Sequence, residues 1–142
     1  MSASVSGQIR RLTAIDLQKS HVLPAAAASV GTASINFEST TLGPAADDIE
    51  ATISIDATPA LVDAKTIILT VEDSADNSSF TVIPGVGSLT VTGASSAGAA
   101  AASQRFKFPP ATRQYVRASA AVLTGGGDNT AVSFYLKVFP NS

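Results

Sequence analysis

Residues 105–122 read RFKFPPATRQYVRASAAV, two alternating stretches joined at Pro109-Pro110. In the first stretch the phenylalanines should face a core while Arg105 and Lys107 face solvent, because successive side chains of a strand point to opposite faces. The second stretch alternates again, with small apolar residues at every second position from Val116 to Val122. Proline cannot donate to a sheet ladder, so we expect a stiff corner that ends one strand and directs the next.

The same period of two recurs along most of the chain. Residues 49–57, IEATISIDA, place isoleucine or alanine at every second position and polar residues between them. Residues 130–139 place Val132, Phe134, Leu136 and Val138 on one face. Other strands are predicted over residues 34–39, 66–73, 80–83, 88–92, 105–108 and 113–123. Residues 125–129, GGGDN, are predicted to form a hairpin turn in which glycines supply positive φ.

About eight short antiparallel strands with regularly spaced turns indicate an all-β, single-domain jelly roll or β-sandwich. A doubly wound α/β fold would need helical periods between the strands, and the sequence has none. Residues 1–33 are apolar but aperiodic, and we interpret them as an extended N-terminal arm. The arm would lie along its own sandwich or reach a neighbour, and residues 34–142 would form the sandwich domain.

The composition excludes several classes of chemistry. The chain has no cysteine, which excludes disulfides and thiolate sites, and its single histidine excludes a two-histidine metal site. No apolar run is long enough to span a membrane, and the N-terminus shows no signal-peptide pattern. We therefore expect a protein made in the cytoplasm, with no membrane partner.

The carboxylates cluster at Asp47-Asp48 with Glu50, and at Glu72-Asp73 with Asp76, in turns or at strand ends. We interpret both clusters as solvated turns; the alternatives are an adventitious Ca²⁺ site and a catalytic pair. No nucleophile motif accompanies the histidine. The sequence therefore predicts a protein that is not an enzyme, with no catalytic residue, no cofactor and no metal.

The charges are unevenly distributed. Residues 1–24 have three cations and one acid, residues 25–100 one cation and nine acids, and residues 101–142 five cations and one acid. Basic ends around an acidic middle indicate self-complementarity, within one fold or between subunits. The basic stretch could bind single-stranded nucleic acid, but its phenylalanines are out of phase with its cations. We therefore expect solvated or self-paired outer faces, and no nucleic-acid partner.

Two motifs resemble capsid cement (decoration) proteins of tailed phages. One is a strand ending in an acidic turn, with Glu72, Asp73, Ser74 and Asp76. The other is an Arg-x-x-x-Pro-Pro-x-Thr-Arg-x-Tyr-x-Arg segment. Its matching positions are Arg105, Pro109, Pro110, Thr112, Arg113, Tyr115 and Arg117. The resemblance covers roughly residues 34–139.

The resemblance implies a jelly roll on the outside of an icosahedral head, where it would bridge neighbouring major capsid subunits as a homo-oligomer, a dimer or trimer. It implies a virion protein assembled in the host cytoplasm, whose N-terminal extension makes intersubunit contacts. The residues expected to contact the shell or a sister subunit are Arg10, Arg11, Leu12, Ile15, Leu17, Val22, Leu23, Arg113, Tyr115 and Arg117.

Two other functions remain open. One is a carbohydrate-binding β-sandwich module, which would need exposed aromatic platforms; the chain has no tryptophan and only Tyr115 and Tyr135 as tyrosines. The other is a tail or head-completion component with the same β body.

Overall fold

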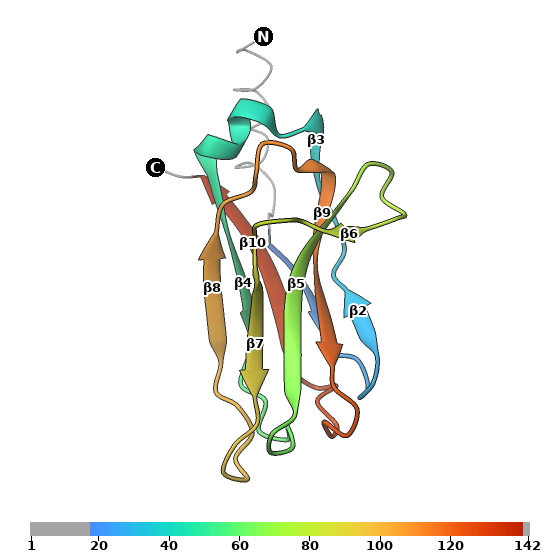
Figure 1. Ribbon diagram of the computed structural model, residues 1–142, viewed down its shortest axis with the longest axis vertical. Coiled ribbons are helices and arrows are strands. Elements are labelled where there is room, and N and C mark those ends of the chain that lie inside the picture. Colours follow the sequence, from blue (N-terminus) through green and yellow to red (C-terminus); the bar gives the residue numbers. More distant parts are fainter. Residues whose placement is uncertain (1–17, 141–142) are drawn as a thin grey trace.

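Two antiparallel β-sheets pack face to face in the computed structural model of the chain (Figure 1). The structure describes residues 18–140. The elements are β1 (Gln18–Val22), β2 (Ser29–Gly31), β3 (Ile35–Thr41), the 3₁₀ helix η1 (Gly43–Asp48), β4 (Ile49–Ile55), β5 (Thr66–Ser74), β6 (Thr81–Val82), β7 (Ser88–Thr92), β8 (Ala102–Phe106), β9 (Arg113–Val122) and β10 (Ser133–Pro140). The predicted all-β sandwich is confirmed.

The strand order is that of a jelly roll. Sheet A has the order β1-β10-β4-β8, and sheet B is built around β9 and β5. β2 and β3 pair with successive parts of β9, and β6 and β7 with successive parts of β5, so each of these pairs occupies one edge position. The ten strands thus fill eight positions. The first position pairs with the last, the second with the seventh, the third with the sixth and the fourth with the fifth.

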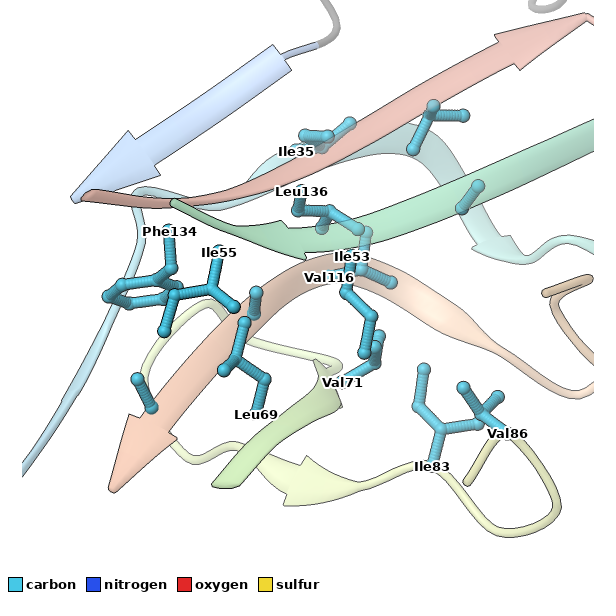
Figure 2. Packing of buried hydrophobic residues seen from close by; sticks show 14 of the residues in the cluster. Ile35, Ile53, Ile55, Leu69, Val71, Ile83, Val86, Val116, Phe134 and Leu136 are labelled. Carbon is cyan, nitrogen blue, oxygen red and sulfur yellow. The ribbon is translucent and has the colours of Figure 1, made fainter. Parts of the chain in front are cut away.

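The core lies between the two sheets, where the predicted alternation holds. The inward residues of β4, at every second position from Ile49 to Ile55, are at most 2% exposed. Inward residues of β5, β9 and β10, including Val71, Val116 and Leu136, meet them from the other strands (Figure 2). Alanines 118 and 120 are fully buried, and their small side chains let the sheets approach closely.

The Pro109-Pro110 corner carries the chain from β8 in sheet A to β9 in sheet B (Figure 1). The carbonyl of Pro110 accepts a hydrogen bond from the N–H of Gly43 at 2.8 Å, which ties the corner to the start of η1. Phe108 is buried just before the corner, in edge-to-face contact with Phe37 and Phe106. β8 ends at Phe106, two residues earlier than predicted, because the residues before the prolines already leave the ladder.

The glycine-rich segment 125–129 is not a hairpin turn, so that prediction is wrong. β9 ends in sheet B and β10 begins in sheet A, and the segment crosses between them. Gly125 and Gly127 do have positive φ, 81° and 89°. The composition therefore predicted the backbone conformation, which glycine alone adopts freely. It did not determine which sheet the following strand would join.

The described part of the predicted arm lies along its own sandwich. β1 pairs with β10 at the edge of sheet A, from Gln18 opposite Lys137 to Val22 opposite Ser133. β2 pairs with β9 at the edge of sheet B. Two short strands joined by the segment LPAAAA, residues 23–28, explain why residues 18–33 show no sustained period.

Candidate functional site

The contact residues predicted in the N-terminal segment fall into two groups. Val22 is 46% exposed at the end of β1, whereas the next residue, Leu23, is 1% exposed and belongs to the core. Leu23 is therefore not available for an intermolecular contact: its N–H donates to the carbonyl of Val132 at 2.9 Å, and its side chain points inward. The remaining residues lie outside the described part of the chain: Arg10, Arg11, Leu12, Ile15 and Leu17.

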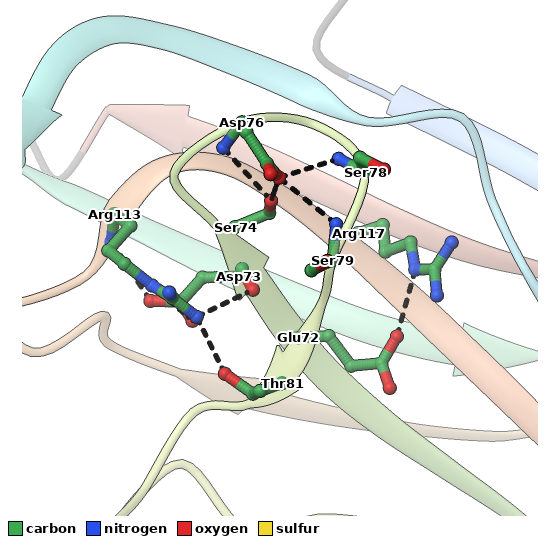
Figure 3. Close-up of polar contacts among 9 residues, drawn as sticks. All are labelled: Glu72, Asp73, Ser74, Asp76, Ser78, Ser79, Thr81, Arg113 and Arg117. Atoms are coloured by element: carbon green, nitrogen blue, oxygen red, sulfur yellow. Dashed lines mark hydrogen bonds and ion pairs between the residues drawn. The ribbon is translucent and has the colours of Figure 1, made fainter.

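Arg113 is held by a carboxylate of its own chain, and its side chain is 36% exposed. Its backbone N–H donates to Oδ2 of Asp73 at 2.9 Å, and its Nη2 donates to Oδ1 at 2.8 Å (Figure 3). The same Nη2 reaches the hydroxyl of Thr81 at 2.6 Å, so one guanidinium joins β9, β5 and β6. Asp73 is 6% exposed, which corrects the expectation of a solvated turn at this position.

Arg117 is also engaged within the chain. Its Nε donates to Oε1 of Glu72 at 2.8 Å, and its guanidinium carbon lies 4.1 Å from the ring centroid of Phe80. Arg105 pairs with Glu50 in sheet A. Tyr115 lies between the two paired arginines of β9 and is half-buried. The prediction of self-paired outer faces is thus confirmed for these three arginines, and cations from the basic C-terminal part meet acids from the middle of the chain.

The acidic turn after β5 uses its carboxylate locally (Figure 3). Oδ1 of Asp76 accepts the backbone N–H groups of Ser78 and Ser79 at 2.9 and 3.0 Å and the hydroxyl of Ser74 at 2.8 Å. These hydrogen bonds, that from Ser79 most of all, lower the pKa of Asp76 to about 2. The carboxylate therefore stabilises its own turn, as expected for turn chemistry.

Within residues 18–140, no group of three or more histidine, aspartate or glutamate side chains could hold a metal ion. No helix in that range is long and apolar enough to cross a membrane.

The outer face of sheet B also carries an uncharged patch, which lies next to the region of the paired arginines. In one row Ser29, Ala121, Ile68 and Thr90 lie side by side across four strands. Ile68 is 40% exposed and the nearby Leu123 47%. Between them lies a shallow depression of about 360 Å³. We call this patch the Ile68 face; it comprises Ser29, Thr66, Ile68, Thr90, Ala121 and Leu123.

The signal for this face in the sequence is the alternation of residues 66–73, TIILTVED, in which Ile68 faces outward because Ile67 and Leu69 face inward. Ile68 is not among the contact residues predicted from the sequence.

The outer face of sheet A is different in chemistry. A depression of about 430 Å³ lies over β1, β4 and β10, and it is lined by hydroxyl, amide and aromatic side chains and one lysine. We call it the Tyr135 face; it comprises Gln18, Thr52, Ser54, Tyr135, Lys137 and Phe139.

No protein-family model matches the chain, and no curated protein matches its sequence. Among solved structures, the chain is similar to the PBSX exported protein XepA, with a TM-score of 0.54 and 12% identity over 87% of this chain. It spans 37% of the length of that protein. It is also similar to the CBM28 module described as specific for non-crystalline cellulose, with a TM-score of 0.52 and 10% identity over 89% of this chain and 74% of that one. At these identities the likeness is one of fold: the chain is an all-β sandwich of the kind found in both proteins.

Proposed function

We propose that the protein is a structural virion protein that binds the outside of an icosahedral phage head and cements neighbouring major capsid subunits. The observation that carries this proposal is the Ile68 face. The jelly-roll body and the sequence resemblance to capsid cement proteins support it.

The Ile68 face has the composition of a protein-binding surface. Charged residues are depleted at the centres of protein interfaces, and the six residues of this face carry no charge. The exposed side chains of Ile68 and Leu123 supply apolar area, and the hydroxyls around them supply hydrogen bonds. A continuous sheet is also rigid, so little conformational entropy is lost on docking.

The intramolecular ion pairs favour a protein partner over a nucleic acid. A protein recognises a phosphate backbone with cations that are available to replace the counterions of the nucleic acid. Arg105, Arg113 and Arg117 already have carboxylate partners in their own chain. The partner in this proposal is the major capsid protein, without cofactor or catalysis.

Cementing would follow from added contact area across a seam of the shell. The protein would act on the capsid exterior as a homo-oligomer, a dimer or trimer. Many symmetric copies convert modest single contacts into tight overall binding, because each further contact of an oligomer is intramolecular.

The test is the occupancy of purified heads that lack the protein. Ile68→Glu places a charge at the centre of the Ile68 face, and we expect it to lower occupancy at saturating protein at least tenfold. The matched control is Ser103→Glu, which adds the same charge to an exposed position of sheet A. Equal occupancy by both variants would contradict docking through the Ile68 face. Binding to tails but not to heads would indicate a tail or head-completion component.

The N-terminal contribution is tested by truncation. A deletion of residues 1–24 would remove β1 and Leu23 from the fold, so the informative deletion ends at residue 16. We expect this shorter protein to fold and to lose occupancy. Full occupancy would show that the N-terminal segment makes no contact with the shell.

A further inference from the structure

The outer face of sheet A points away from the Ile68 face, on the other side of the sandwich (Figure 1). We propose that the Tyr135 face binds a neutral oligosaccharide. The proposal is independent of capsid cementing, because it uses different residues on a different sheet.

The register places five of the six lining residues in two rows across three strands. One row contains Tyr135 and Ser54, and the next contains Gln18, Lys137 and Thr52. Three strands with two intervals span about 10 Å, and the four residue intervals from Tyr135 to Phe139 span about 13 Å. The depression is therefore wide enough for more than one sugar ring, and it is open along the sheet.

Two aromatic side chains stand at the ends of this face. Tyr135 and Phe139 project from the same side of β10, and both are half-buried. The hydroxyl of Tyr135 donates to Oδ2 of Asp56 at 2.7 Å, and this bond raises the pKa of Tyr135, so the phenol stays protonated at neutral pH. Arg105 lies with its guanidinium carbon 5.3 Å from the ring centroid of Phe139 and also pairs with Glu50. Both rings are thus positioned by neighbouring strands before any ligand arrives.

The chemistry between the rings fits a sugar. A pyranose has a C–H face that packs on an aromatic ring and a rim of hydroxyls that both donate and accept hydrogen bonds. The hydroxyls of Thr52 and Ser54 and the amide of Gln18 offer donors and acceptors at that rim. A few such groups beside apolar rings are the usual composition of a small-molecule site.

The charges of this face favour a neutral ligand. Arg105 and Glu50 at its border pair with each other, and the remaining charges, Lys137 in the lining and Asp56 beside Tyr135, are equal and opposite. One ammonium group does not make the row of cations that a phosphate backbone requires. The lining also contains no leucine, isoleucine or valine, the side chains that give the Ile68 face its character.

The test titrates the purified full-length protein with cellohexaose, maltohexaose and chitohexaose, three neutral hexasaccharides that differ in linkage or substituent, and screens it on an array of neutral glycans. We expect saturable changes in the NMR chemical shifts of the backbone amides of Thr52, Ser54 and Lys137 with at least one hexasaccharide or array ligand. Tyr135→Ala and Phe139→Ala should each weaken that binding at least tenfold. Tyr115→Ala, which removes the other tyrosine, from sheet B, should leave it within about twofold.

A blocking variant guards against loss of fold. Thr52→Lys fills the depression without removing an aromatic ring, and it should abolish the shifts while the melting temperature stays close to that of the wild type. No binding by any hexasaccharide or array glycan, or binding that survives Tyr135→Ala and Thr52→Lys, would overturn the proposal. Loss of head occupancy in Tyr135→Ala without glycan binding would instead identify this face as a protein-docking surface. Ile68→Glu should still bind glycan, which would show that glycan binding and capsid docking use different faces.

Discussion

Asp73 shows how a sequence pattern and its chemistry can point in different directions. Alternation along β5 places Asp73 on the same side as Val71 and Leu69, toward the core, although a carboxylate normally stays in water. The fold accommodates it because Arg113 supplies a backbone N–H and a guanidinium in the right places. The alternation of β5 thus correctly predicts that the Asp73 side chain points inward, and its charge correctly predicts that it needs a hydrogen-bonding partner there.

The Asp73 carboxylate should matter more than other carboxylates of the molecule. Asp73→Asn keeps the shape but replaces an acceptor with an NH₂ group that faces the N–H donors of Arg113. We expect a loss of about 2–4 kcal/mol in the free energy of unfolding, because the partly buried donors of Arg113 lose their partner at a buried position. Urea unfolding followed by circular dichroism measures this loss.

The matched control is Glu50→Gln, which removes a carboxylate from an ion pair at the surface. The partner there, Arg105, has a side chain that is 69% exposed, so water replaces the lost interaction. The expected loss is below about 1 kcal/mol. Similar losses in both variants would show that the Arg113–Asp73 contact is no stronger than a surface ion pair.

Among the elements, β1 and the residue that follows it differ most from what the sequence predicts. Val22 and Leu23 were both predicted to make intermolecular contacts, since both are apolar and lie in an aperiodic segment. In the structure the chain turns inward directly after Val22, and Leu23 closes the core beside Val132. β1 lies at the edge of sheet A and none of its five residues is buried, so its sequence has no apolar face whose period could be recognised.

Truncation of these two neighbours should therefore change the free energy of unfolding by very different amounts. We expect Leu23→Ala to cost about 2–5 kcal/mol, since it creates a cavity in the core. Val22→Ala should change the free energy of unfolding by no more than about 0.5 kcal/mol, as for other exposed positions. Thermal and urea unfolding of the two variants measure the difference. Equal and small effects would mean that Leu23 is not anchored in the core in solution.

Most other elements were predictable, for a physical reason. The long strands β4, β9 and β10 each bury one face, so their sequences must alternate, and alternation is visible in a single sequence. The order of strands in the two sheets was not visible. The crossover at residues 125–129 looks like a hairpin turn, because local composition determines backbone angles but not the distant partner of a strand.

At the scale of the whole molecule, cations from the basic C-terminal part form ion pairs with acids from the middle of the same chain. The predicted self-complementarity had two explanations, and Arg105, Arg113 and Arg117 support the one within a single chain. Neither proposed binding face was predicted from the sequence. Each face combines side chains from three or more strands, and the pairing that brings them together is not encoded in any one segment.

Because these arginines are paired within the chain, the proposed docking through the Ile68 face gives a prediction about the effect of salt. If the uncharged Ile68 face makes the principal contact, binding to heads should depend little on salt, because screening acts on charges. The Debye length falls from about 10 Å at 0.1 M to about 3 Å at 1 M ionic strength. We expect the dissociation constant of the full-length protein on purified heads to change less than about threefold over this range of sodium chloride.

The same titration separates contacts made by the Ile68 face from contacts made by the N-terminal segment. Contacts made chiefly by Arg10 and Arg11 would weaken steeply as salt rises, at least tenfold over the same range. The protein lacking residues 1–16 provides the control, since it keeps the Ile68 face and loses both arginines. A steep salt dependence that disappears in this truncated protein would contradict a principal role for the Ile68 face. It would assign that role to the basic N-terminal segment instead.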